Sequence, residues 1–406
     1  MEKLARTFSL KAFCKLRRFA HESFLGRKRF QTLMEPSMKD FQPYAPMPFY
    51  PGPVSMHPAV ASALAKDYAP PRMGTEYLEL YCSVRSQLKS LLGTEEDVLI
   101  GTGEGMLVLW GALKSLLKPG DTVLTVGTGV FGDGFADMAE TIGCRAIRIS
   151  EPYNTTISAD TLEKVKDAAK RHHPLLMTAV HCETPSGTLN PLKALGALKK
   201  ELGIPFFVVD AVASAGGAPV HADAWNADCV LGGSQKCLSC PPDMSFMSVS
   251  AAAWDRIRMV NYAGYDALRP FHNAIEDPMR FPYTPNWWGV AALSASLTAL
   301  EHEGMDNVFA RHERVSLQCR EGIKELGLNL WPEENAVNSP TVTAIRVPDG
   351  WEWNKWRTAL ADQGLYVGGS LGPLAGKVFR MGHMGTQADS AAMASALAVM
   401  KNILCQ

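Results

Sequence analysis

Between residues 97 and 234, short apolar stretches alternate with segments whose apolar residues recur at helical spacing. The apolar stretches are DVLIG, TVLTVG, CRAIRIS, PLLMTAVHC, IPFFVVD and DCVLGGS. Helical segments such as GFADMAETIG, SADTLEKVKDAAKRH and PLKALGALKKELG lie between several of them. Strands that are almost continuously apolar are typical of a parallel sheet covered by helices on both faces. The pattern therefore predicts an α/β fold with a mostly parallel, largely buried sheet.

Different patterns flank this alternation. Residues 43–58 are rich in proline, which predicts an extended or turning entry, and a helical stretch follows from Glu76 to Leu92. A long helix-like stretch over residues 285–304 ends the alternation, and the remainder reads as a smaller α+β part. We therefore expect a basic N-terminal extension (1–40), a large domain (41–305) and a small C-terminal domain (306–406).

The overall composition is that of a globular protein, but its charge is uneven. The chain has 406 residues, a formal net charge of −1 and no apolar run near the roughly 20 residues that span a bilayer, so we expect neither nucleic acid nor membrane as a partner. Residues 1–34 carry nine Lys or Arg against two Glu, with Leu and Phe at roughly helical spacing. This composition suits a mitochondrial transit peptide, a solvated tail, or a later start at Met34 or Met38. We expect a cytoplasmic protein, or a mitochondrial-matrix protein if residues 1–34 are a transit peptide.

The nine cysteines are scattered, which indicates free thiols in a reducing compartment. Cys237 and Cys240 form a single CxxC without a second pair or a histidine at zinc-site spacing, so we expect no metal.

The loops after the predicted strands carry the candidate chemistry, because ligands of open parallel sheets bind outside the carboxyl ends of the strands. Asp210 ends the strand in FFVVDAVAS, and Lys236 follows the strand in DCVLGGSQK. The aspartate is either a helix N-cap or a fixed anion for a cationic ring nitrogen. Partial burial would lower the pKa of the lysine and make it nucleophilic, as a Schiff-base lysine requires. Such a pair is what pyridoxal phosphate chemistry needs.

Three further loops support this hypothesis. The stretch ETPSG supplies hydroxyls at Thr184 and Ser186, and GTGVFGDG supplies Phe131, an aromatic side chain able to stack on a flat ring. The stretch GTGEG offers backbone N–H donors at a predicted helix N-terminus, which suit a phosphate. Glu104 in the middle of this stretch is unexpected, because a carboxylate repels a phosphate.

Four motifs taken together, VVDAVASAGG, GSQKCLSCPP, ETPSGTLNP and GKVFRMG, resemble those of class V aminotransferases of fold type I. The resemblance runs from about Phe49 to the C-terminus and lies in the branch of alanine–glyoxylate aminotransferase and pyridoxamine–pyruvate transaminase. It implies that Lys236 forms a Schiff base with pyridoxal 5′-phosphate and moves a proton between substrate Cα and cofactor C4′. It also implies that Asp210 keeps the ring nitrogen protonated and that Arg380 clamps the substrate carboxylate.

The same resemblance implies a homodimer that transfers an amino group between a small amino acid, L-alanine, and a small 2-oxo acid, glyoxylate or pyruvate. Pro51–Val54 would line the substrate entrance. The implied cofactor contacts are the ring faces at Phe131 and Val212, the ring hydroxyl at Thr184, and the phosphate at Thr102, Gly103, Gln235 and, from the neighbouring subunit, Thr284.

Two residues point to different branches. The resemblance implies that pyridoxamine–pyruvate transaminases carry a glutamate where this chain has Glu104. Those enzymes treat the unphosphorylated ring as a substrate. Glu104 would then accept a hydrogen bond from a hydroxymethyl group; alternatively it turns outward and favours the positive end of its helix. Leu371 stands where that branch would carry a second arginine, and Gln235 and Thr284 suit a phosphate. Free pyridoxamine or pyridoxal as substrate is therefore the alternative to a bound cofactor.

Other classes of protein fit the sequence less well. GTGVFG is a literal GxGxxG with Glu151 about 20 residues further on, as in a dinucleotide-dependent oxidoreductase, but it lies far from the first strand of its domain. That reading, like a purely structural or binding role, leaves Asp210 and Lys236 without a task. Cysteine desulfurases commonly carry histidine before the lysine, where this chain has Gln235.

Overall fold

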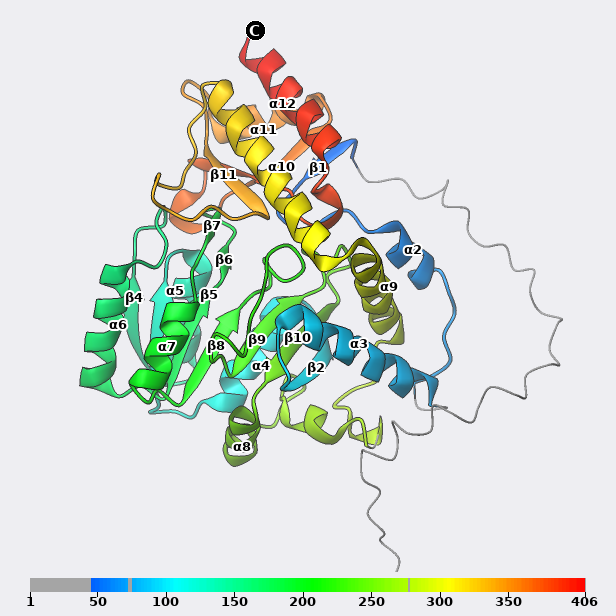
Figure 1. The fold of residues 1–406 in the computed structure, drawn as a ribbon, viewed down its shortest axis with the longest axis vertical. Helices are drawn as coiled ribbons and strands as arrows, with labels where there is room; N and C mark the ends of the chain where they lie inside the picture. The colour runs from blue at the N-terminus through cyan, green and yellow to red at the C-terminus, as the bar shows by residue number, and fades with distance from the viewer. Residues whose placement is uncertain (1–44, 72–74, 277, 406) are drawn as a thin grey trace, which may run out of the picture. The chain divides into compact units, whose positions relative to one another are not determined.

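The computed structural model describes residues 45–71, 75–276 and 278–405. The predicted N-terminal extension, with its transit-peptide interpretation, lies outside these residues. Residues 41–406 belong to one compact unit, and Figure 1 shows a large sheet with helices on both faces beneath a smaller sheet and its helices.

The large sheet has seven strands, and its mostly parallel character confirms the predicted fold class. Neighbouring strands are parallel except β10, which is antiparallel to both of its neighbours, β2 and β9. Because β10 alone is reversed, the other six strands point the same way and end at the same edge. In sheet order the strands are β2 (Asp97–Thr102), β10 (Met244–Val249), β9 (Cys229–Gly233), β8 (Phe206–Asp210), β5 (Leu176–Val180), β3 (Thr122–Gly127) and β4 (Arg145–Ser150).

The helices between these strands follow the predicted alternation. The capping box of Ser158 and Thr161 starts α6, and a left-handed Gly93 ends α3. Helix α5 begins four residues before the predicted segment, within GTGVFGDG itself. The helices of this part are α2 (Pro58–Leu64), α3 (Glu76–Leu92), α4 (Gly105–Leu116), α5 (Val130–Thr141), α6 (Ala159–His172), α7 (Lys193–Glu201), α8 (Ala251–Val260) and α9 (Trp287–Glu303). A two-stranded hairpin, β6 (Cys182–Glu183) with β7 (Thr188–Leu189), stands beside the large sheet.

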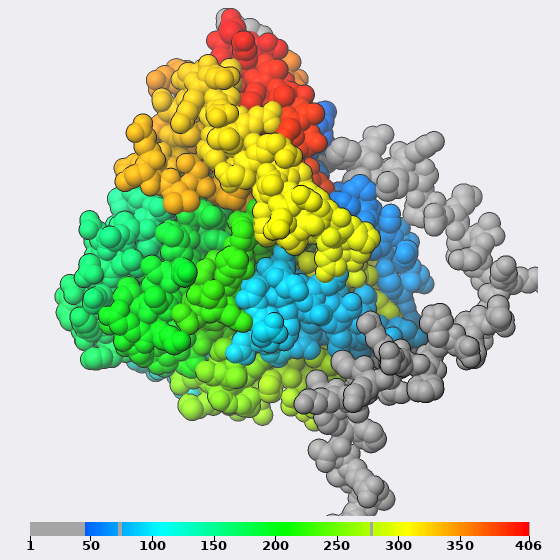
Figure 2. All heavy atoms as spheres, in the orientation of Figure 1, coloured from blue at the N-terminus to red at the C-terminus, as the bar shows by residue number. Residues whose placement is uncertain are grey.

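The smaller sheet joins both ends of the described chain. Strand β1 (Met47–Phe49), from the proline-rich entry, pairs in parallel with β12 (Leu365–Gly369), and the order continues through β13 (Val378–Gly382) to β11 (Val342–Arg346). Helices α10 (Met305–Glu325), α11 (Trp353–Asp362) and α12 (Ser390–Leu404) pack around it. Figure 2 shows this part lying directly against the residues of the large sheet. The predicted division into domains near residue 305 stays a prediction. Strand β1, although it lies in the predicted large domain, belongs to the C-terminal sheet.

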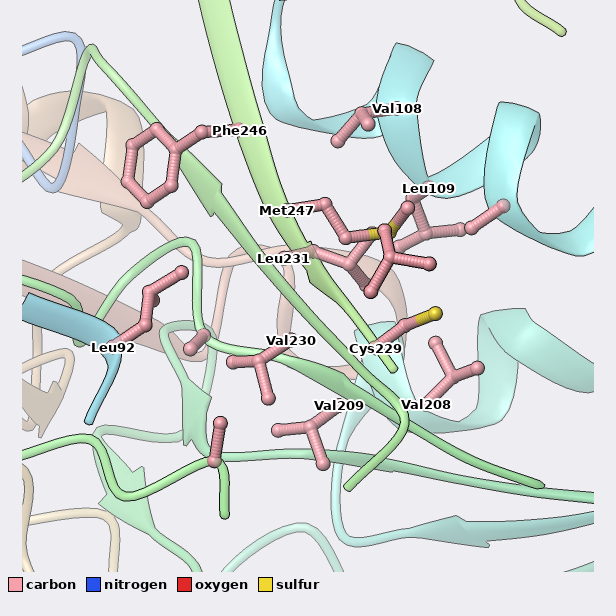
Figure 3. Close-up of a cluster of buried hydrophobic side chains, with 14 of the residues drawn as sticks. Leu92, Val108, Leu109, Val208, Val209, Cys229, Val230, Leu231, Phe246 and Met247 are labelled. Atoms are coloured by element: carbon pink, nitrogen blue, oxygen red, sulfur yellow. The ribbon is translucent and has the colours of Figure 1, made fainter. Parts of the chain in front are cut away.

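Each sheet has its own apolar core. The larger core lies between the seven-stranded sheet and its helices, and Figure 3 shows side chains of β8, β9 and β10 meeting those of α4 there. The smaller core centres on Trp356 and Phe379, both fully buried. None of the helices in the described ranges is both long and apolar enough to cross a membrane.

The core account predicts the effect of a single truncation. Leu231 is fully buried in β9, so Leu231→Ala should lower the free energy of unfolding by about 2–5 kcal/mol through lost burial and a residual cavity. Leu317→Ala is the matched control, because this leucine on α10 is 47% exposed. Urea unfolding followed by circular dichroism measures both. Equal effects of the two substitutions would contradict the core account.

Candidate active site

The predicted site residues gather where the six like-directed strands end. Thr102 ends β2, Asp210 ends β8, and Gln235 and Lys236 follow β9. A further side chain, Arg380, reaches the same place from β13 of the smaller sheet. The fold therefore brings together residues that lie up to almost 280 positions apart in the sequence.

Asp210 is buried at the tip of β8. Its Oδ1 accepts the Val212 N–H at 2.8 Å, and its backbone carbonyl accepts the His181 N–H at 2.8 Å. The pKa of Asp210 is raised to about 6, chiefly by burial and in smaller part by the Glu104 carboxylate, while the Val212 N–H and the charge of Lys236 oppose the shift. Of the two readings of Asp210, the helix N-cap is not what the structure shows, because no helix begins after β8 at this residue.

Lys236 extends toward the entry loop at Pro51–Val54. Its Nζ donates a hydrogen bond to the Pro51 carbonyl, and a Cβ built on Gly52 would lie 2.6 Å from Nζ. Burial lowers the pKa of Lys236, and the positive charge of Arg380 lowers it further, whereas Glu104 opposes the shift. The lysine is therefore more readily available as a neutral amine than a solvated lysine is. Pro51 and Gly52 thus contact the lysine, and the role of Pro51–Val54 at a substrate entrance stays a prediction.

Arg380 is a buried cation without an acid. Its side chain is held by the Gly369 carbonyl, with Nε at 2.9 Å, and by Thr184, whose Oγ1 lies 3.4 Å from Nη1. Within the described ranges Arg380 forms no ion pair, and desolvation lowers its pKa to about 10. An uncompensated buried guanidinium is costly, so the arrangement favours an anionic ligand at this position.

Glu104 turns into the site while it also caps a helix. Its Oε2 accepts the Met106 N–H at 2.9 Å at the start of α4, and the Gln235 side-chain amide donates to its Oε1. The outward orientation considered for this residue is therefore wrong, although the helix-end interaction is present. The carboxylate occupies the helix N-terminus at which the sequence predicted an anion.

The backbone N–H groups of Thr102 and Gly103, expected to bind a phosphate, already have hydrogen-bond partners within the chain. The N–H of Thr102 donates to the Tyr283 hydroxyl at 2.8 Å, and the N–H of Gly103 donates to the Asp243 carbonyl at 2.7 Å. Thr284 is exposed and has no hydrogen bond to any described residue of its own chain. Tyr283 is a site residue that the sequence reasoning missed; its position next to Thr284 in FPYTP was the available signal.

Val212 lies in the loop after β8, and Phe131 lies at the start of α5. The Val212 side chain packs so closely on α4 that a Cβ on Gly105 would lie 2.8 Å from it. Phe131 lies in the first turn of α5, where its N–H donates to Glu183 at 3.3 Å. Glu183 is a second buried acid that the sequence reasoning did not single out, although it begins the quoted ETPSG motif.

The remaining candidates are thiols, and they form no metal cluster. The cysteines of the described part, Cys237 and Cys240 among them, are all free. Those same ranges contain no group of three or more His, Cys, Asp or Glu placed to hold a metal ion.

The residues present fit a pyridoxal ring. The buried Gln235 Oε1 has no hydrogen-bond partner within the described chain, and Arg380 has hydrogen-bond partners there but no acid. The same site holds an amine and a buried carboxyl group, the two groups that an aldehyde-bearing pyridine requires. The fold therefore places a buried amine and a buried acid at the sheet edge where ligands of α/β enzymes bind.

Comparison with known proteins identifies the family. The family described as aminotransferase class-V matches residues 64–384, and the chain belongs to this family. It is 33% identical over 347 residues to a pyridoxamine–pyruvate transaminase of Mesorhizobium japonicum, covering 83% of this chain and 86% of that protein. It is 30% identical over 347 residues to an alanine–glyoxylate aminotransferase of Oryctolagus cuniculus, covering 83% and 87%. The structure of a ureidoglycine–glyoxylate aminotransferase from Bacillus subtilis superposes with a TM-score of 0.84 at 27% identity, covering 90% and 94%.

The raised pKa of Asp210 predicts how stability depends on pH. A carboxyl group whose folded pKa exceeds its unfolded value of 3.8 contributes stability below the unfolded value and loses it as pH rises through about 6. Without cofactor, the free energy of unfolding should therefore fall between pH 4 and pH 7 by an amount on the order of 3 kcal/mol relative to Asp210→Asn. Urea titrations at several pH values measure this difference.

Asp160→Asn, at an exposed aspartate on α6, is the control and should follow the wild type at every pH. The same pH profile in Asp210→Asn and wild type would show that Asp210 is not desolvated as described.

Proposed function

We propose that the protein is a pyridoxal 5′-phosphate-dependent aminotransferase that moves an amino group between a small amino acid and a small 2-oxo acid, with L-alanine and glyoxylate giving pyruvate and glycine. The observation that supports this best is the buried amine of Lys236 in one site with buried Asp210 and the guanidinium of Arg380, which is close enough to lower the pKa of the lysine. Pyridoxal phosphate, when bound, supplies an aldehyde and a ring that accepts electron density from substrate Cα. The residues of the chain then have to bind, orient and move protons.

Lys236 is the proposed base. A lowered pKa leaves more of its Nζ neutral near pH 7, so it can take a proton from substrate Cα and return it. Asp210 remains ionised above about pH 6 and would hold the proton of the ring nitrogen. Pro51 is proposed to hold Nζ through its carbonyl, because the entry loop closes over the lysine.

Arg380 is proposed to bind the substrate carboxylate with its planar fork, which gives direction as well as charge. Thr184, in contact with Arg380, would reach the ring hydroxyl, and Phe131 and Val212 would pack on the two ring faces. The loop after β12 supports a small apolar donor. Its Ser370 Oγ donates to the Pro185 carbonyl at 2.8 Å beside Thr184, and the following Leu371, 42% exposed, stands where the pyridoxamine–pyruvate branch would carry a second cation.

The phosphate contacts would come from the Thr102 hydroxyl, from Gln235 and from Thr284 of a neighbouring subunit, whereas the Gly103 N–H, expected there from the sequence, already donates to the Asp243 carbonyl. Thr284 is exposed and forms no hydrogen bond within the described chain, which supports a contact outside its own chain. We therefore propose a homodimer with each site completed by its partner.

The lysine assignment predicts the effect of one substitution. Lys236→Ala should lower kcat for the alanine–glyoxylate reaction by at least about 10³-fold, because both the amine and the base are lost. It should also remove the absorption band that the lysine gives with the cofactor. Lys164→Ala, on the exposed surface of α6, is the control and should keep both. Near wild-type turnover of Lys236→Ala would overturn the proposed mechanism.

The second candidate function is a pyridoxamine–pyruvate transaminase, in which the unphosphorylated ring is a substrate. The observation that favours it is Glu104, whose carboxylate faces Gln235 at the N-terminus of α4. A carboxylate about 4 Å from a phosphate costs several kcal/mol at an effective dielectric constant of about 20. The same carboxylate would accept a hydrogen bond from a ring hydroxymethyl group.

Glu104→Gln distinguishes the two candidates. If the phosphorylated ring is the cofactor, the wild-type protein should purify with one pyridoxal phosphate per chain and turn over alanine and glyoxylate. If the second candidate is right, the wild-type protein should be colourless and consume free pyridoxamine with pyruvate. Relative to the wild type, Glu104→Gln should then bind pyridoxal phosphate at least about tenfold more tightly and free pyridoxal more weakly. Equilibrium dialysis with each ring compound measures these affinities, and Glu163→Gln on exposed α6 is the control.

A further inference from the structure

A fully buried carboxylate, that of Glu183, lies beside the site and has no role in the proposed chemistry. Glu183 ends β6, directly before Thr184, and its Oε1 accepts the Gly132 N–H at 2.6 Å while Oε2 accepts the Phe131 N–H at 3.3 Å. No ion pair to Glu183 exists among the described residues, so its hydrogen bonds go to the first turn of α5.

The loop before α5 is built around this carboxylate. A Cβ on Gly129 would lie 2.5 Å from the Glu183 carboxyl carbon, and a Cβ on Gly132 would lie 3.1 Å from Oε1 and 2.7 Å from the Gly127 Cα. The three glycines of GTGVFG therefore give room to an internal carboxylate and to a tight turn. This accounts for the GxGxxG pattern without a dinucleotide.

The hydrogen bonds, more than the charge, tie Glu183 to this turn. The pKa of Glu183 is raised to about 8, chiefly by burial and in smaller part by Asp210 and Asp133, while the Gly132 and Phe131 N–H groups lower it. Near pH 7 the protonated form therefore predominates, and its two oxygens accept the N–H groups of the first turn. The Glu183 side chain thus fixes the turn that carries Phe131.

We propose that Glu183 is a positioning residue that holds Phe131 in place against the cofactor ring. This inference rests on the proposed function, since Phe131 is the ring-stacking residue there. Two adjacent residues would then serve the ring site. Glu183 would position Phe131, and Thr184 contacts Arg380.

A double-mutant cycle on cofactor affinity tests the proposal. The probes are pyridoxal 5′-phosphate and unphosphorylated pyridoxal, titrated into the apoprotein while tryptophan fluorescence is followed. Glu183→Gln should weaken binding of the preferred ring compound about tenfold, because the amide cannot accept both N–H groups. In a Phe131→Ala background the same change should weaken it less than twofold, since the residue through which it acts is gone. KM for the amino donor should change less than twofold in Glu183→Gln, because Arg380 is held independently by Gly369.

Asp133→Asn is the matched control on the same helix. Asp133 anchors the first turn of α5 from the other side through Ser150, at 2.6 Å, and Tyr153, at 2.7 Å. An equal loss of affinity in Asp133→Asn, or additive effects of Glu183→Gln and Phe131→Ala, would overturn the proposal. Unchanged affinity in Phe131→Ala alone would overturn the stacking role of the proposed function together with this inference. A Phe131→Ala effect without a Glu183→Gln effect would overturn the inference only.

Discussion

The structure depends on the desolvation of charged groups at one edge of a parallel sheet. Asp210 and Lys236 are buried where β8 and β9 end, Arg380 is buried within β13 beside them, and no acid among the described residues pairs with the arginine. Burying such groups costs free energy that only the apolar cores beneath them offset. The shifted pKa values follow from this burial, which raises the pKa of Asp210 and lowers the pKa values of Lys236 and Arg380.

Carboxylates set the other half of the electrostatics. Glu104 and Glu183 each lie at the N-terminus of a helix, α4 and α5, and each accepts backbone N–H groups there. Two helix ends that could receive a ligand's anion are thus already occupied by side chains of the protein. At α4 this bears on which form of the ring the enzyme accepts, and at α5 it fixes the loop that carries Phe131.

Much of the site could be predicted from the sequence because it consists of strand ends. Asp210 ends one apolar run and Lys236 follows another, and this pattern predicts polar side chains at the carboxyl ends of parallel strands. Helix boundaries were less certain: α5 starts within a glycine-rich stretch that reads as a loop, since its first turn depends on Glu183, 52 positions from Phe131. The sequence did not predict strand β10, because its serines interrupt the apolar run. In the structure all of its residues are buried, and its two edges pair with β2 and β9.

The sequence by itself determined the fold class, the family and the placement of Asp210 and Lys236 at strand ends, because periodicity and short motifs are local properties of the chain. Only the tertiary structure decided which way Glu104 turns, that Tyr283 takes the Thr102 N–H, and that Arg380 is left without an acid. These outcomes depend on which groups from distant segments exclude water from one another. Such desolvation has no signature in the neighbours of any single residue.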